Sequence, residues 1–99
     1  MEQLLATLRA EMPHLVERFG VRSLALFGSY VRGDATDLSD VDILVEFQAG
    51  HKTFDSFMDT CLLLEDILGR TVEVVTPDGL SPHLKPHIFK ELVHVSMPD

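Results

Sequence analysis

Two aspartates separated by one residue are the part of this sequence best suited to chemistry. Asp40 and Asp42 stand at the start of an alternating apolar run that ends at Phe47. Residues two apart in a strand share a face, so we expect both carboxylates to point the same way. Two carboxylates about 5 Å apart repel by roughly 3 kcal/mol at an effective dielectric of about 20. A buried structural strand gains nothing from that repulsion, whereas a divalent cation removes it.

A glycine–serine pair precedes the aspartates, with ten residues between Ser29 and Asp40. Gly28 lets the backbone approach a phosphate, and Ser29 offers a hydroxyl and an N–H where a short helix over 30–33 can begin. Magnesium prefers carboxylate oxygens and completes its shell with water and substrate phosphates. The two features together predict metal-assisted phosphoryl or nucleotidyl transfer.

The pattern Gly-Ser-x10-Asp-x-Asp resembles the signature of the DNA polymerase beta-type nucleotidyltransferase superfamily. A longer pattern resembles that of its smallest branch, the MNT-type minimal nucleotidyltransferases, and adds Arg32, Gly33 and Ser39. The resemblance covers roughly residues 20–95, and segment 68–77 looks like the family's strand with a third carboxylate. It implies that Gly28, Ser29 and Arg32 bind nucleotide phosphates. For Arg32, a surface ion pair with Asp34 or Asp37 remains an equal alternative.

Glu73 is the candidate third carboxylate. It interrupts a β-branched run over 71–76, which is unexpected for a side chain facing a dry core. If this strand lies beside strand 40–47, Glu73 reaches the two aspartates. The resemblance implies that Asp40, Asp42 and Glu73 are catalytic and hold two Mg²⁺ ions. The family usually has Asp at the third position, so Glu73 departs from it by one methylene group.

The resemblance also implies an activity and a partner. It predicts a protein adenylyltransferase that moves AMP from ATP to a hydroxyl of a HEPN-type ribonuclease toxin, and so acts as the antitoxin. Two alternatives stay open: an antitoxin that neutralises its partner by contact alone, and a small-molecule adenylyltransferase. Relatives of the second kind carry an additional helical domain.

Composition limits the remaining possibilities. The chain has 99 residues, of which 45% are apolar and 24% charged, as expected for one globular domain. We expect a single domain over 1–99, with an N-terminal helical segment (1–20) and a catalytic core (21–96). The net charge of −8 with scattered basic residues counts against autonomous nucleic-acid binding and suits a basic protein partner or a cationic small molecule. There is no apolar run of about 20 residues and no signal-peptide pattern, so no membrane association and a cytoplasmic location are expected.

The hydrophobic pattern predicts an α/β (α+β) fold, a small mixed sheet of about four strands flanked by helices, as in polymerase beta-like nucleotidyltransferases. Strands are expected over 21–27, 40–47, 71–76 and 92–95. Helices are expected over 2–19, with a kink or break at Pro13, and over 53–68, capped by Thr53. A short helix is expected to begin at Ser81 and Pro82. The buried side of helix 53–68 is predicted to consist of Phe54, Phe57, Met58, Cys61, Leu62, Leu64 and Leu68.

Overall fold

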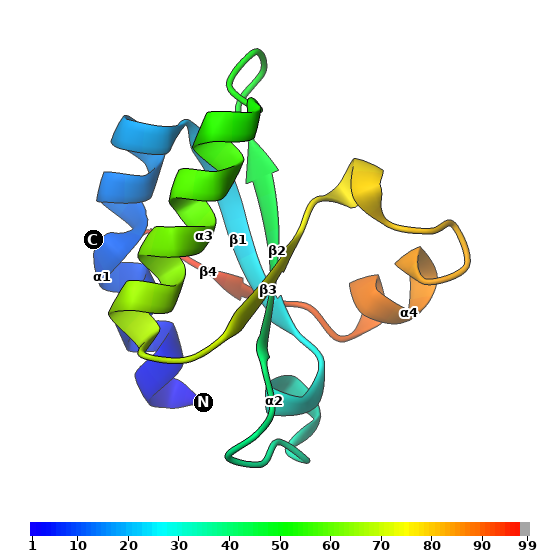
Figure 1. The fold of residues 1–99 in the computed structure, drawn as a ribbon. Helices are drawn as coiled ribbons and strands as arrows, with labels where there is room; N and C mark the ends of the chain where they lie inside the picture. The colour runs from blue at the N-terminus through cyan, green and yellow to red at the C-terminus, as the bar shows by residue number, and fades with distance from the viewer. Residues whose placement is uncertain (98–99) are drawn as a thin grey trace.

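A four-stranded mixed sheet forms the centre of the computed structural model, which describes residues 1–97 (Figure 1). Its strands are β1 (Val21–Phe27), β2 (Val41–Phe47), β3 (Val72–Val75) and β4 (Val93–Val95), arranged in the order β3-β2-β1-β4. Strand β1 is antiparallel to β2 and β4, whereas β2 and β3 are parallel. The predicted mixed sheet is therefore confirmed. Residues 98 and 99 of the predicted domain 1–99 lie outside the described residues.

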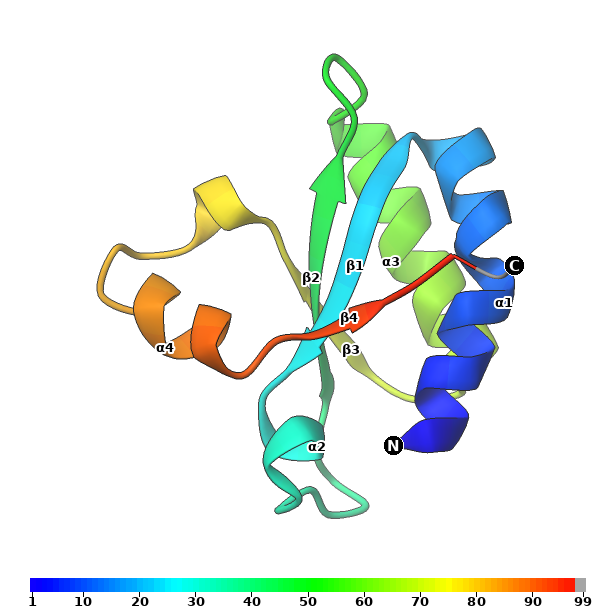
Figure 2. The same ribbon diagram turned by 180° about the vertical axis from the view of Figure 1, so that it is seen from behind.

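Two long helices, α1 (Glu2–Phe19) and α3 (Phe54–Leu68), cover one face of the sheet (Figures 1 and 2). The core of α1 is formed by Leu8, Met12 and Leu15, all fully or almost fully buried. Of the kink or break predicted at Pro13, the break is wrong, because Pro13 lies inside one helix. Burial of apolar side chains on both sides of the proline stabilises the helix through tertiary packing, despite the missing backbone donor.

Helix α3 begins and ends as its sequence predicts. Thr53 forms a capping box with Ser56, in which the Ser56 N–H donates to Thr53 Oγ1 at 3.1 Å and the Thr53 N–H donates to Ser56 Oγ at 2.9 Å. Gly69 ends the helix in the left-handed conformation, with φ of 64°. These caps satisfy backbone groups that have no partner within the helix.

The buried side of α3 differs from the prediction. Thr60 and Leu64 are fully buried, whereas Phe54 is 78% exposed and Leu62 is 59% exposed. Met58, also predicted to be buried, is exposed as well. The helix is apolar around most of its circumference, so periodicity alone left its inward face open, and packing against α1 and the sheet decides it.

The other face of the sheet carries a smaller apolar cluster of Ala25, Phe27 and Leu44. The 3₁₀ turn η1 (Pro77–Gly79) and helix α4 (Lys85–Lys90) lie on this side (Figures 1 and 2). The prediction that this helix begins at Ser81 and Pro82 is wrong. Ser81 opens a turn, in which its carbonyl accepts from the Leu84 N–H at 3.0 Å. The helix begins later because Pro86, which lacks an N–H, suits the first helical turn.

One four-residue helix, α2 (Ser29–Arg32), follows β1 directly, and residues 33–40 return the chain to β2. Helix α2 lies at one end of the sheet, beside the starts of β2 and β3 (Figure 1). Within residues 1–97, no helix combines the length and apolar character that crossing a membrane requires.

Candidate active site

The end of β1 and the starts of β2 and β3 meet at one edge of the sheet. In the strand register, Phe27 is paired with Asp42, and Asp42 is paired with Glu73 on the next strand. The antiparallel β1–β2 pair and the parallel β2–β3 pair therefore place three segments together that lie far apart in the sequence. Gly28 and Ser29 follow Phe27 at this same edge. The expectation that the Glu73 strand lies beside the aspartate strand is confirmed.

Asp42 lies in a crowded acidic environment. Its pKa is raised from 3.8 to about 6, first by burial, then by a hydrogen bond with Glu73 and by the negative charges of Glu73 and Asp40. The positive charge of Arg32 acts in the opposite direction. A proton shared between neighbouring carboxyl groups belongs to the pair rather than to one residue. Asp40 itself comes directly before β2 and is exposed.

The carboxylates of Asp42 and Glu73 fit magnesium as part of its ligand shell. Among residues 1–97, no three His, Cys, Asp or Glu side chains converge closely enough to enclose a metal ion by themselves. Magnesium is normally held by one or two carboxylates and completes its shell with water and substrate phosphates. Asp42 and Glu73 provide such a carboxylate pair, and a divalent cation would relieve the repulsion that raises the pKa of Asp42.

Position 28 requires glycine for two reasons, its backbone conformation and the lack of space for a side chain. Its φ of 82° and ψ of −153° are rarely accessible to residues with a side chain. A Cβ at this position would overlap an Asp42 carboxylate oxygen and lie 2.9 Å from Asp42 Cγ. The glycine thus lets the corner after β1 pack directly against the candidate metal ligand.

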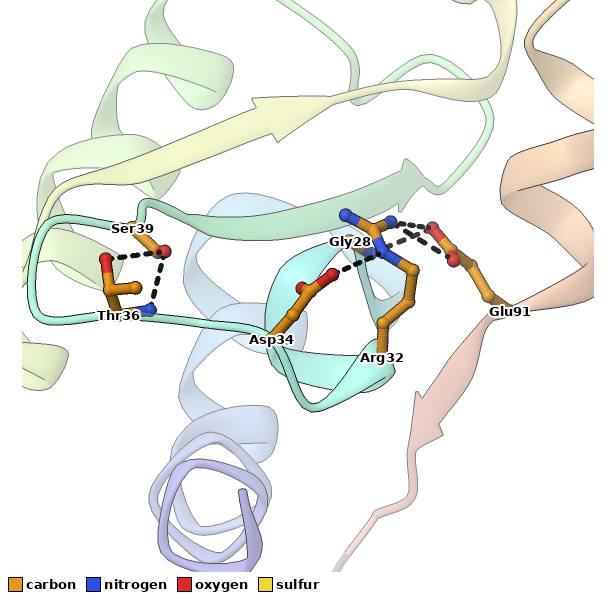
Figure 3. A network of polar contacts seen from close by, with 6 residues as sticks. All are labelled: Gly28, Arg32, Asp34, Thr36, Ser39 and Glu91. Carbon is orange, nitrogen blue, oxygen red and sulfur yellow. Dashed lines mark hydrogen bonds and ion pairs between the residues drawn. The ribbon is translucent and has the colours of Figure 1, made fainter.

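Arg32 reaches back to the same corner (Figure 3). Its Nε donates to Asp34 Oδ2 at 3.5 Å, and its Nη1 contacts Glu91 Oε1 and Oε2 at 3.3 and 3.4 Å. The ion pair with Asp34 was one of the two sequence-based interpretations, whereas the contact with Glu91 was not anticipated. The Gly28 N–H, at the corner predicted to approach a phosphate, donates to Glu91 Oε1 at 3.0 Å.

The loop before Asp40 is closed by its own side chains. The Thr36 N–H donates to Ser39 Oγ at 2.8 Å, as Figure 3 shows. The Val41 N–H, at the start of β2, donates to the Thr71 carbonyl at 3.0 Å. These bonds set the direction in which the chain enters β2 and so the position of Asp40.

A polar cleft of about 760 Å³ lies beside Asp40, lined by residues 37–40, by Glu65 and Leu68, and by residues 69–71. At its edge, Arg70 Nη1 donates to the Tyr30 hydroxyl at 2.7 Å, and the guanidinium carbon lies 5.6 Å from the Tyr30 ring centroid. This contact ties α2 to the turn before β3. The two segments that carry Ser29 and Glu73 are thereby held together.

Residues 7–95 match the nucleotidyltransferase domain family. The protein adenylyltransferase MntA of Thermococcus cleftensis is 39% identical over 95 residues, which are 96% of this chain and 95% of the relative. A solved structure named as a minimal nucleotidyltransferase is 36% identical to this chain and superimposes with a TM-score of 0.72. The match covers 90% of this chain and 93% of the other.

A more distant structure shares the fold. It is the MNT antitoxin complex with a tri-AMPylated HEPN toxin of Shewanella oneidensis, matched at 16% identity and a TM-score of 0.68, over 98% of this chain and 72% of the other. A toxin–antitoxin structure with AMP-PNP matches at 20% identity and a TM-score of 0.70, over 92% and 74%.

The chain belongs to the nucleotidyltransferase domain family, as the glycine–serine and Asp-x-Asp residues predicted. Within this family, its resemblance to the MNT-type minimal nucleotidyltransferases is confirmed by relatives of nearly the same length. The residue that sequence reasoning missed is Glu91. It is an ordinary glutamate in the polar end of a short helix, 63 residues from Gly28, and no local pattern connects the two.

Proposed function

We propose that this protein transfers AMP from ATP to a hydroxyl group of a partner protein. The observation that carries the proposal is the register that sets Asp42 beside Glu73 and beside the Gly28–Ser29 corner. The protein adenylyltransferase activity named for its 39% identical relative supports the same reaction.

In this proposal the acidic residues hold magnesium and the corner holds phosphate. Asp40, Asp42 and Glu73 would hold two Mg²⁺ ions whose ligand shells are completed by nucleotide phosphates and water, and Ser29 and Arg32 would contact the β- and γ-phosphates. Bound Mg²⁺ neutralises phosphate charge and stabilises the charge that develops during transfer. The Gly28 N–H already donates to Glu91. We therefore assign to Gly28 the close approach of the backbone to the phosphates, and to Ser29 the hydrogen bonds donated to them.

The reaction forms one bond to the α-phosphorus, breaks one bond from it and moves one proton. The acceptor oxygen bonds to the α-phosphorus of ATP, the bond from that phosphorus to the oxygen bridging it to the β-phosphorus breaks, and pyrophosphate leaves. The acceptor's hydroxyl proton goes to the Glu73 carboxylate, which we assign as general base. Glu73 suits this part because it is exposed at the edge of the sheet.

We assign a HEPN-type toxin as the acceptor, which makes the protein an antitoxin. Fold neighbours include complexes of MNT antitoxins with such toxins, one of them tri-AMPylated. The net charge of −8 favours a partner with a basic surface. A cytoplasmic location, where ATP is supplied, fits this assignment.

Mass spectrometry of the partner tests the proposal and separates it from neutralisation by contact alone. The protein is incubated with Mg-ATP and the product of the adjacent gene. We expect an AMP-sized mass gain on that product, lost with Asp42→Asn or excess chelator and kept with Glu46→Gln, an exposed acidic residue of β2. Neutralisation without a mass gain would contradict AMP transfer and favour the contact model. A mass gain on a small hydroxylated molecule alone would favour small-molecule adenylylation.

A further inference from the structure

Glu91 joins the two parts of the candidate phosphate site. It caps the C-terminal end of α4, just before β4, and its carboxylate accepts from the Gly28 N–H and from Arg32 Nη1 (Figure 3). Its side chain is 23% exposed, whereas that of Arg32 is 52% exposed. One carboxylate from the end of the chain thus contacts both the backbone and the guanidinium of the corner.

Both contacts have a physical reason. Gly28 is buried, and a buried N–H without a partner is costly, so the carboxylate supports the unusual backbone of the corner. The contact with Arg32 joins opposite charges: one guanidinium nitrogen, Nη1, lies 3.3 and 3.4 Å from the two carboxylate oxygens, which orients the guanidinium toward Glu91. Together the two contacts restrain the Gly28 backbone, before Ser29, and the Arg32 guanidinium, after it.

We propose that Glu91 is a positioning residue for nucleotide binding and acts through Arg32 and Gly28. The inference rests on the proposed function, because it concerns the same phosphate site. As a carboxylate, Glu91 does not itself bind a polyphosphate. Within residues 1–97, the recorded contacts of Arg32 use Nε and Nη1, which leaves Nη2 for a phosphate oxygen.

Calorimetric titration with Mg-ATP tests this role. The variants are Glu91→Gln, Glu91→Asp, Arg32→Met and the double variant E91Q/R32M, with Glu46→Gln as the matched control. The E91Q variant keeps an oxygen for the Gly28 N–H but loses the charge that holds Arg32. Its Mg-ATP dissociation constant is expected to rise about two- to fivefold, because the lost contact is a partly exposed ion pair. The E91D variant, which keeps the charge, is expected to bind more tightly than E91Q.

The double variant shows whether Glu91 acts through Arg32. If it does, E91Q has little further effect once Arg32 is replaced, because coupled residues are not additive. In steady-state AMP transfer, E91Q should raise the KM for ATP more than it lowers kcat. A loss of folded structure alone would not produce that separation, and circular dichroism of each variant checks the fold.

Several results would overturn the inference. They are unchanged Mg-ATP affinity in both E91Q and E91D, tighter binding in E91Q, and a full additional loss in the double variant. Tighter binding would show that the carboxylate competes with the triphosphate. If the unaltered protein binds no Mg-ATP, the proposed function fails and the positioning role fails with it. If the unaltered protein and both Glu91 variants bind alike, only the role of Glu91 fails.

Discussion

Asp42 is half-buried between the Gly28 backbone and Glu73 of the neighbouring strand. At this residue, the arrangement suited to holding a cation opposes folding when the cation is removed. The pKa of Asp42 is raised to about 6 because burial and neighbouring negative charge both disfavour its ionised form. Ionised Asp42 therefore destabilises the folded state. The acidic neighbours of Asp42 are therefore better explained by ligand binding than by stability.

The pH dependence of stability tests this explanation for Asp42. Between pH 3.8 and about 6 the folded state holds more protons than the unfolded state, so unfolding free energy falls as pH rises through this window. Without magnesium, Asp42→Asn should remove that fall and stabilise the protein at pH 7 by on the order of 1 kcal/mol, a value reduced for solvent screening. Urea unfolding at pH 4 and 7 measures it, with Asp59→Asn on α3 as the exposed control. Parallel pH profiles for D42N and the unaltered protein would contradict the explanation.

Gly28 and Gly33 have nearly the same φ, 82° and 83°, but different ψ, −153° and 13°. An added Cβ at Gly28 would overlap the Asp42 carboxylate, whereas at Gly33 it would meet nothing within 4 Å. Gly33→Ala should therefore cost only the left-handed backbone strain, about 1 to 2 kcal/mol. Gly28→Ala should cost more and abolish AMP transfer, since it displaces a candidate metal ligand. Thermal unfolding and AMP-transfer rates measure both, and equal effects of the two substitutions would show that the contact with Asp42 is unimportant.

At the scale of elements, the parallel pairing of β2 and β3 determines which acidic residues meet. A slip of the register by one residue would turn Glu73 to the opposite face. The buried neighbours Val41 and Ile43 on β2 and the packed Val72 and Val74 on β3 hold that register, because their apolar side chains share the face covered by the helices.

Substitutions at Glu73 test the result of this register. Glu73→Asp keeps the carboxylate and should retain AMP transfer, and Glu73→Gln should lower the rate by about 10²-fold or more through loss of the proposed general base. Initial rates across pH measure both. Equal rates for the unaltered protein, E73D and E73Q would exclude Glu73 from the site.

Local sequence signals predicted most of the elements. The apolar run over 21–27, the Thr53 cap and the Gly69 stop each depend on neighbouring residues, and each prediction matches the structure. The errors concern long-range packing. The inward face of α3 depends on α1 and the sheet, and α4 begins where Pro86 fits its first turn rather than at Ser81.

At the scale of the whole molecule, the site is assembled from four separated segments: the corner after β1, the start of β2, β3 and the end of α4. Residue types, spacing and the family resemblance proposed Gly28, Ser29, Asp40, Asp42 and Glu73 as candidates, and the strand register places Asp42 beside Glu73 and the Gly28 corner. Residue types and spacing were insufficient for Glu91, because its contact with Gly28 depends on how the chain after β3 returns to the sheet at β4. The sequence therefore proposed a chemistry for the site, and the fold added Glu91, which contacts both Gly28 and Arg32.

A crystal structure with Mg²⁺ and a non-hydrolysable ATP analogue tests the central claim most directly. We predict metal density in contact with Asp42 and Glu73, and a triphosphate lying along Ser29 and Arg32. Nucleotide bound elsewhere on the surface, with water alone between Asp42 and Glu73, would contradict the account.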